Sequence, residues 1–154
     1  EISERKLRVE DAINSARAAV QEGIIAGGGS VLVQIAQELR SYADEFSGDT
    51  QVGVLALAKA LVKPTFWIAE NAGVDGSVVV SRVADLKNGF GFNAATLGYD
   101  DLLAAGIIDP VKVTHSAVVN ATSVARMVLT TEASVVDKPQ PPAPPAPGGH
   151  VHHH

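Results

Sequence analysis

Two features near the start of the sequence have the residue types of a nucleotide site, an acid and a run of glycines. Asp11 lies in the segment RVEDAINSARAAVQEGIIAGGGS, which ends in three glycines at 27–29 and a serine. A carboxylate can position or activate a water molecule beside a phosphate. Glycines at the start of a helix leave backbone N–H groups open to an anion. Each feature also has a simpler interpretation, as an acid in the first turn of a helix and as a corner between two helices.

The glycine run departs from the common phosphate-binding motifs. No Lys-Ser or Lys-Thr pair follows Gly29, which excludes a Walker A loop, and the run is not a GxGxxG motif after a strand. The sequence has no cysteine, so disulfides and thiolate metal sites are excluded. It also has no HExxH, Ser-His-Asp or paired-carboxylate pattern. These residues alone indicate a helical domain without an assigned function.

Other polar residues also have both a functional and a simpler interpretation. Asn93 follows alternating aromatic and glycine residues and precedes Ala94 and Ala95. An amide with two small neighbours could border a flat ring such as adenine, although a turn is the commoner explanation. Asp109 precedes Pro110, and this pair predicts a helix that begins there with Asp109 as its N-cap.

The end of the chain is rich in histidine. His150, His152, His153 and His154 could bind a divalent metal ion. An expression tag or a weakly chelating tail explains them as well. His115 stands alone in a helical segment, and we expect it on the surface.

The composition indicates one globular domain built mainly from helices. Of 154 residues, 46% are hydrophobic and only 5% are aromatic, which favours closely packed helices rich in Ala and Val. The net charge is −5 without a basic stripe, which argues against a nucleic-acid binder. No run of 18 apolar residues occurs, so no membrane-spanning helix is expected. The charged start is no signal peptide and lacks an initiator Met, which suggests a chain cut from a longer protein.

The spacing of apolar residues predicts the elements that position these side chains. Helices are expected over residues 8–22, 30–46, 50–71, 76–86, 100–105 and 110–131. Pro64 should kink or divide the third of them, and Asp49 is its predicted N-cap. A strand or hairpin is expected over 88–97, with short strands at 107–108 and 134–137. The last helix is expected to bury Val113, Ala117, Ala121, Val124, Val128 and Leu129.

Two segments together resemble one protein family. They are residues 8–30 and the stretch GFNAATLGYDDLLAAGIIDPVKVTHSAVVNATSVARMVLTTEASVVDKP at 91–139. With the motifs VEDA, GGG, NAAT, IIDP and TTE in order, residues 5–139 resemble the C-terminal part of a group I chaperonin, the GroEL type. The Pro- and His-rich end differs from the family's usual Gly-Gly-Met repeats, which suggests a His-rich-tailed paralogue.

The resemblance implies a fold and a division of the chain. The fold would be mainly α, an equatorial-domain-like multi-helix bundle with a short β-hairpin and a short C-terminal strand. Residues 1–22 would belong to a helix of the intermediate domain, and residues 23–137 would form the C-terminal half of the equatorial, ATP-binding domain. Residues 138–154 would be a disordered Pro- and His-rich tail.

The resemblance also implies site residues. Asp11 matches the catalytic aspartate of VEDA, which approaches the γ-phosphate and the attacking water. Gly28, with Gly27 beside it, matches the nucleotide-contacting glycine. The remaining nucleotide-binding positions, around the purine and the ribose, are Asn93, Ala94, Ala95, Ile107 and Asp109. Of these, Asp109 would bind the ribose hydroxyls.

For the longer protein, the resemblance implies ATP-dependent protein folding with ATP and Mg²⁺. The partners would be other subunits in a homo-oligomeric ring, a co-chaperonin and unfolded client proteins, in the cytoplasm. The family's phosphate loop and metal-binding aspartate are not in this sequence, so we expect no hydrolysis and no tight nucleotide binding by the chain alone. Phe66 stands where the family often has a basic residue between rings, which argues against a double ring.

Two other functions remain open at this stage. The chain could act alone as a helical self-association or interaction module, since its faces toward the missing half would be exposed. The His-rich tail could bind metal or nucleic acid. Neither alternative involves a membrane.

Overall fold

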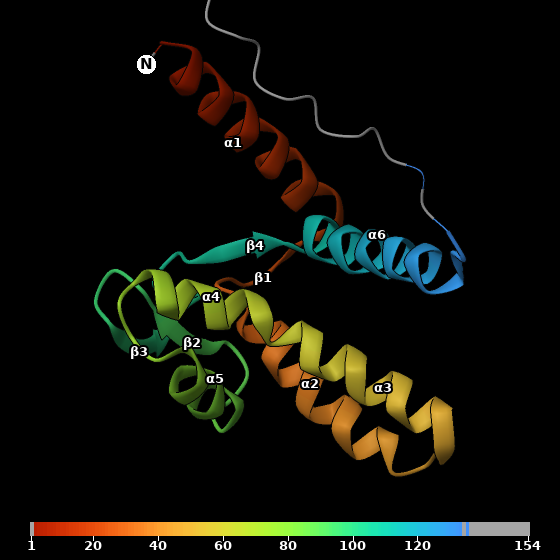
Figure 1. Cartoon of the computed structure of the whole chain (residues 1–154). Coiled ribbons are helices and arrows are strands. Elements are labelled where there is room, and N and C mark those ends of the chain that lie inside the picture. Colours follow the sequence, from red (N-terminus) through yellow and green to blue (C-terminus); the bar gives the residue numbers. More distant parts are fainter. Residues whose placement is uncertain (1, 134, 136–154) are drawn as a thin grey trace, which may run out of the picture.

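Helices make up most of what the computed structural model describes, residues 2–133 and 135 (Figure 1). In chain order the elements are α1 (Ile2–Glu22), β1 (Ile24–Ala26), α2 (Ser30–Ala43), α3 (Gly48–Leu61), α4 (Lys63–Asn71), α5 (Gly76–Ala84), β2 (Phe90–Asn93), β3 (Gly98–Asp101), β4 (Ile108–Pro110) and α6 (Val111–Thr130). The expected mainly helical fold with a short hairpin is confirmed. The strand expected at 134–137 lies outside the described residues except for Val135, and the tail at 138–154 lies wholly outside them.

The core lies where α2, α4 and α5 meet the hairpin of β2 and β3. Its largest cluster consists of the buried residues Val33, Ala69, Val79, Val83 and Phe92. A second cluster joins α2 to α3 through Ala36, Ala58 and Leu61. The side chains of both clusters are mostly small, which allows the helices to approach closely. This agrees with the Ala- and Val-rich composition.

The helices and strands of this group begin and end largely as the sequence predicted. Pro64 lies in the first turn of α4 and divides the segment 50–71 into α3 and α4. The N-cap of α3 is Ser47 and not Asp49, which lies inside the first turn. The helix predicted over 100–105 is wrong, because β3 continues to Asp101 and a turn follows it.

The strand β1 was not among the elements expected from the sequence. It pairs antiparallel with β4, so that Ile25 lies opposite Asp109. This pairing also corrects the predicted start of α6, because Asp109 belongs to the strand and Pro110 is the N-cap. The backbone N–H of Val111 donates to the carbonyl of Gly23 at 3.1 Å and ties this helix start to the end of α1.

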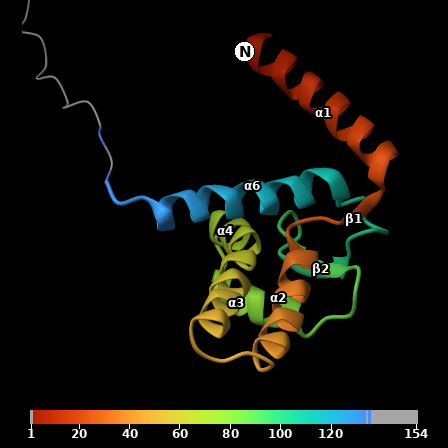
Figure 2. The ribbon, with the colours of Figure 1, turned by 90° about the vertical axis from the view of Figure 1, so that its right-hand side faces the viewer.

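The helices α1 and α6 lie outside the α2–α5 group. The turned view shows α1 extending away from the other helices (Figure 2). The contact between α1 and α6 includes the buried Ala18 and a hydrogen bond from Lys112 Nζ to Gln21 Oε1 at 2.7 Å. In α6, Val118 packs on the second core cluster, but no residue of this helix is buried.

The burial predicted for α6 is therefore wrong for this chain. All six predicted core positions are exposed, and Leu129 reaches an exposed fraction of 86%. The apolar residues follow a helical spacing, but residues 2–133 and 135 supply no surface that buries them.

The stretch Gly48–Asn71 of α3 and α4 is, by length and composition alone, apolar enough to cross a bilayer. It is the one such stretch among the described residues, and core helices of soluble proteins pass the same test. Lys59 and Lys63 lie near its middle, and Ala58 and Ala69 are buried against other helices. The absence of a membrane-spanning helix stays a prediction.

The contact between α4 and α5 depends on a glycine. A Cβ atom at Gly76 would lie 2.6 Å from the carbonyl oxygen of Phe66 and 2.7 Å from its ring atom Cδ2. The N–H of Gly76 donates to Glu70 Oε1 at 2.8 Å, and Asp75 caps the helix through the N–H groups of Ser77 and Val78. Any larger residue at position 76 must therefore separate the two helices.

We expect Gly76→Ala to lower the free energy of unfolding by about 1–3 kcal/mol, because the added methyl group overlaps the backbone of α4. Gly53→Ala is the matched control, since Gly53 lies in α3 with nothing within 4 Å of an added Cβ. That control should raise stability by roughly 0.5–1 kcal/mol. Urea unfolding of both variants checks this. Equal effects of the two substitutions would contradict it.

Candidate functional site

The glycine turn between β1 and α2 is held in a conformation that glycine allows. Gly28 and Gly29 have φ angles of 64° and 72°. The buried Thr65 of α4 donates its hydroxyl to the carbonyl of Gly28 at 2.9 Å. The buried Ser30 donates its hydroxyl to the carbonyl of Gly27 at 2.9 Å. The hydroxyl groups of Thr65 and Ser30 therefore hold the backbone of the turn in place.

Two distant segments lie against this turn. The N–H of Gly27 donates to the carbonyl of Ile107 at 2.9 Å, and a Cβ at this glycine would lie 3.1 Å from that oxygen. A Cβ at Gly28 would lie 3.6 Å from the carbonyl oxygen of Phe92, the neighbour of Asn93. The structure thus brings the glycines, Ile107 and the end of β2 together, although about 80 residues separate the first and last of them in the sequence.

The side chain of Asn93 is engaged within the hairpin. Its Nδ2 donates to Asp100 Oδ2 at 2.9 Å, and its Oδ1 accepts the N–H of Ala95 at 3.0 Å. These contacts agree with the interpretation of Asn93 as a turn residue. Ala94 and Ala95 follow it at the exposed tip of the hairpin, where small side chains leave the backbone accessible.

Asp109 is the polar side chain of this region that lacks a partner. It is half-buried on β4, and burial raises the pKa of its carboxyl group above the ordinary value of 3.8. Within residues 2–133 and 135, no donor forms a hydrogen bond or an ion pair with this side chain. A desolvated carboxyl group without a protein partner is a feature of binding sites.

Asp11 is not part of this cluster. It is exposed on α1, eleven residues before the end of the helix, which corresponds to roughly 16 Å along the helix axis. Figure 1 shows α1 leading away from the glycine turn. The structure therefore brings Ile107 and the end of β2 to the glycine turn and places Asp109 two residues beyond Ile107, but it leaves Asp11 apart.

The described residues contain no group of three or more His, Cys, Asp or Glu side chains that could hold a metal ion. His150, His152, His153 and His154 lie outside the described part of the chain. The arrangement offers a hydrogen-bond acceptor without a protein partner at Asp109, on the strand that pairs with the residues before the glycine turn. It does not supply a metal-binding cluster for phosphates.

The sequence did not reveal the supporting roles of Ser30 and Thr65. The only available signal was a hydroxyl residue directly after the glycine run and another directly after Pro64. Both residue types are common near helix starts, so neither position stands out.

Comparison with protein families matches residues 1–139 to the TCP-1/cpn60 chaperonin family. The chain belongs to this family. Chaperonin GroEL 1 of Corynebacterium diphtheriae is 75% identical over 146 residues, which cover 95% of this chain and 27% of that protein. Chaperonin GroEL 1 of Mycobacterium ulcerans is 58% identical over 153 residues, covering 99% of this chain and 28% of that protein. These identities confirm the predicted group I chaperonin segment.

A solved chaperonin structure has the same fold. The open state monomer of a group II chaperonin from Methanococcoides burtonii aligns with a TM-score of 0.67 and 27% sequence identity. The alignment covers 70% of this chain and 28% of that chain. In each of these comparisons the chain spans less than a third of the related chaperonin.

The raised pKa of Asp109 gives a testable dependence of stability on pH. Between 3.8 and the raised pKa, the folded chain binds more protons than the unfolded chain, so this group lowers stability as the pH rises through that window. We expect Asp109→Asn to be more stable than the unsubstituted chain at pH 7, with a difference that shrinks as the pH falls toward 3.8. Urea unfolding across this range measures it.

Asp11→Asn is the control, because it removes the same charge from an exposed position on α1. A stability gain at pH 7 that is equal in both variants would show that net charge, and not burial of Asp109, is responsible.

Proposed function

We propose that this chain supplies the purine and ribose side of the nucleotide site in an ATP-dependent chaperonin subunit. The observation that carries the proposal is the contact of the glycine turn with Ile107, two residues before Asp109, whose half-buried carboxyl group has no partner among the described residues. The complete protein would use ATP hydrolysis to assist protein folding. Membership of the chaperonin family supports this role.

Each residue near the turn has a proposed task. The missing side chain at Gly28 allows close approach of the nucleotide to its backbone, whereas the missing side chain at Gly27 makes room for the carbonyl group of Ile107. The carboxylate of Asp109 accepts the ribose hydroxyls, and these bonds would compensate for its burial. Ala94 and Ala95 border the flat base, and the bonded amide of Asn93 holds their backbone in place. When bound, ATP with Mg²⁺ would supply the phosphoryl group that is hydrolysed.

Asp11 is the proposed catalytic carboxylate, which orients the attacking water. This role requires α1 to turn toward the glycine turn, since Asp11 now lies roughly 16 Å along the helix from its end. Gly23 connects α1 to β1 with a φ of 87° and open space around it. Residues 1–22 would thus be the moving arm of an intermediate domain, and residues 23–137 part of an equatorial domain.

Other proposals for the complete protein rest on family membership alone. They are a ring of identical subunits, a co-chaperonin, unfolded clients, ATP with Mg²⁺ as cofactor and a cytoplasmic location. The missing three quarters would carry the phosphate-binding residues, so hydrolysis is proposed for the complete protein and not for this chain.

A second role, self-association of the isolated chain, is favoured by the bare surface of α6. Its exposed apolar residues are Val113, Val119, Val124, Met127, Val128 and Leu129. An apolar patch of this kind drives association in water. In the complete protein, other parts of the subunit would cover it.

In a complete chaperonin subunit with this sequence, Asp11→Ala should lower ATP turnover by about 10²-fold or more, because the group that orients the water is lost. Nucleotide binding should remain, since Asp11 is remote from the ribose-binding residues. Steady-state hydrolysis and equilibrium binding measure the two effects. Glu10→Ala, which removes the neighbouring exposed acid, is the control. Unchanged turnover in Asp11→Ala would refute the assignment.

The isolated chain should sediment as a dimer or larger species at high protein concentration. The double substitution Val128→Ser and Leu129→Ser should shift it toward the monomer, because these side chains are 68% and 86% exposed on α6. Val20→Ser is the control, since Val20 is 89% exposed on α1, away from this patch. A monomer at every concentration would rule out the module interpretation.

A further inference from the structure

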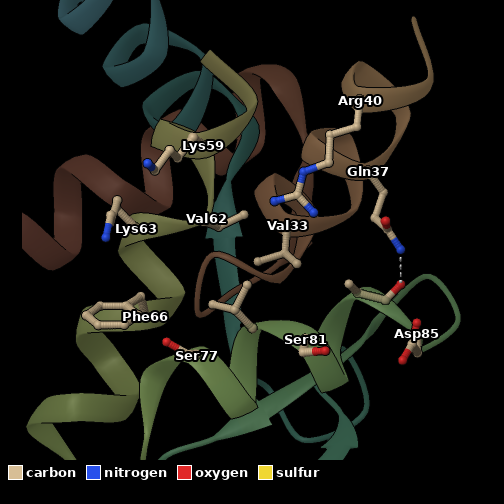
Figure 3. Close-up of a pocket in the computed structure, with 12 residues that line it drawn as sticks. Val33, Gln37, Arg40, Lys59, Val62, Lys63, Phe66, Ser77, Ser81 and Asp85 are labelled. Carbon is tan, nitrogen blue, oxygen red and sulfur yellow. Dashed lines mark hydrogen bonds between the residues drawn. The ribbon is translucent and has the colours of Figure 1, made fainter. Parts of the chain in front are cut away.

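A groove of about 390 Å³ lies between α2, the junction of α3 and α4, and α5 (Figure 3). Its floor is apolar and includes Val33, Val62 and Val80. Gln37 of α2 closes one end, because its Nε2 donates to the carbonyl of Ala84 at 3.2 Å. No residue assigned to the nucleotide site lines this groove.

Three cationic side chains surround the groove. Arg40 reaches over it from α2, whereas Lys59 and Lys63 lie across from it on α3 and α4 (Figure 3). Asp85 is the one carboxylate among the lining residues. The side chains that line the groove therefore carry a net positive charge, in a chain whose net charge is −5.

These cations are available to a ligand. Arg40 and Lys59 form no hydrogen bond or ion pair within the described ranges 2–133 and 135. Lys63 lies 4.5 Å from the centre of the Phe66 ring, an exposed contact that leaves its N–H groups free to donate. The hydroxyl groups of Ser77 and Ser81 on α5 line the facing wall.

Helix stabilisation explains only part of this arrangement. Arg40 and Lys59 lie in the last turns of their helices, where a cation interacts favourably with the helix dipole. Lys63 is the first residue of α4 and also directly follows the C-cap of α3, so the dipoles of the two helices act on its charge in opposite directions. Local helix stability therefore does not account for three cations around one groove.

We propose that this groove binds a small phosphate-bearing anion, with Arg40, Lys59 and Lys63 as its charged contacts. Arg40 would bind two phosphate oxygens through its planar guanidinium group, and the lysines would neutralise the remaining charge. The apolar floor and the Phe66 ring leave room for a non-polar part of the ligand. This proposal does not depend on the nucleotide role of the glycine turn.

Isothermal titration calorimetry with inorganic tripolyphosphate, at fixed ionic strength, tests the proposal on the whole chain. We expect saturable binding of one anion per chain, weakened at least about ten-fold in Arg40→Ala by loss of the charged hydrogen bonds. Arg126→Ala is the matched control, because it removes an equal charge from the exposed surface of α6. Trp67 is the single Trp of the chain, and its ring packs edge-on against the ring of Phe66, with 5.2 Å between the two ring centroids. Its fluorescence should therefore report the same binding.

A second pair of variants distinguishes binding in the groove from a general effect of positive charge. Lys63→Ala should also weaken binding, whereas Lys87→Ala should not. The two lysines are matched because the Nζ of each lies over a Phe ring, 4.5 Å from the ring centre for Lys63 and 4.4 Å for Lys87. Absence of saturable binding would overturn the proposal. Equal weakening by the groove variants and their controls would also overturn it, as would an Arg40-dependent dimer that occupies the groove instead of the anion.

Discussion

The antiparallel pairing of β1 with β4 is the contact on which the arrangement of the chain depends. Each strand has three residues, and together they join segments more than 80 residues apart. The pairing brings the IIDP segment against the glycine turn, and it fixes where α1 ends and α6 begins. Without it, the helices of the α2–α5 group could still pack, but the residues of the candidate site would not meet.

The sequence predicted the helices well because their signals are local. Apolar spacing located α2, α5 and the bulk of α1 and α6, and Pro64 marked the boundary between α3 and α4. Three-residue strands carry no comparable signal, so β1 was missed. Asp109 before Pro110 is a strong local sign of a helix cap, yet long-range strand pairing took that residue into β4.

The candidate site was predictable only through family resemblance. Periodicity cannot reveal that Gly27 contacts Ile107, because this contact depends on strand pairing across most of the chain. Neither the family resemblance nor the periodicity predicts where Asp11 lies relative to the glycine turn, because that position depends on the angle between α1 and β1. The predicted burial of α6 was wrong for another reason, because the part of the chain that the structure describes does not cover the apolar residues of this helix.

The three consecutive glycines are required for different physical reasons. Gly27 accommodates the backbone of Ile107, while Gly28 has a positive φ and little steric restriction. Gly29 has a positive φ and also faces Thr65, whose hydroxyl oxygen would lie 2.7 Å from an added Cβ. The turn is thus specified by strand pairing on one side and by helix packing on the other.

The length of α1 and its single glycine connection give the first helix the mechanics of a lever. Asp11 lies roughly 16 Å from the end of the helix, so a rotation of about 10° at Gly23 would move it by about 3 Å. A small change of backbone angle in one residue is therefore amplified into a displacement the size of a hydrogen bond. The same geometry makes the position of Asp11 sensitive to how firmly Lys112 and Gln21 hold the base of the lever.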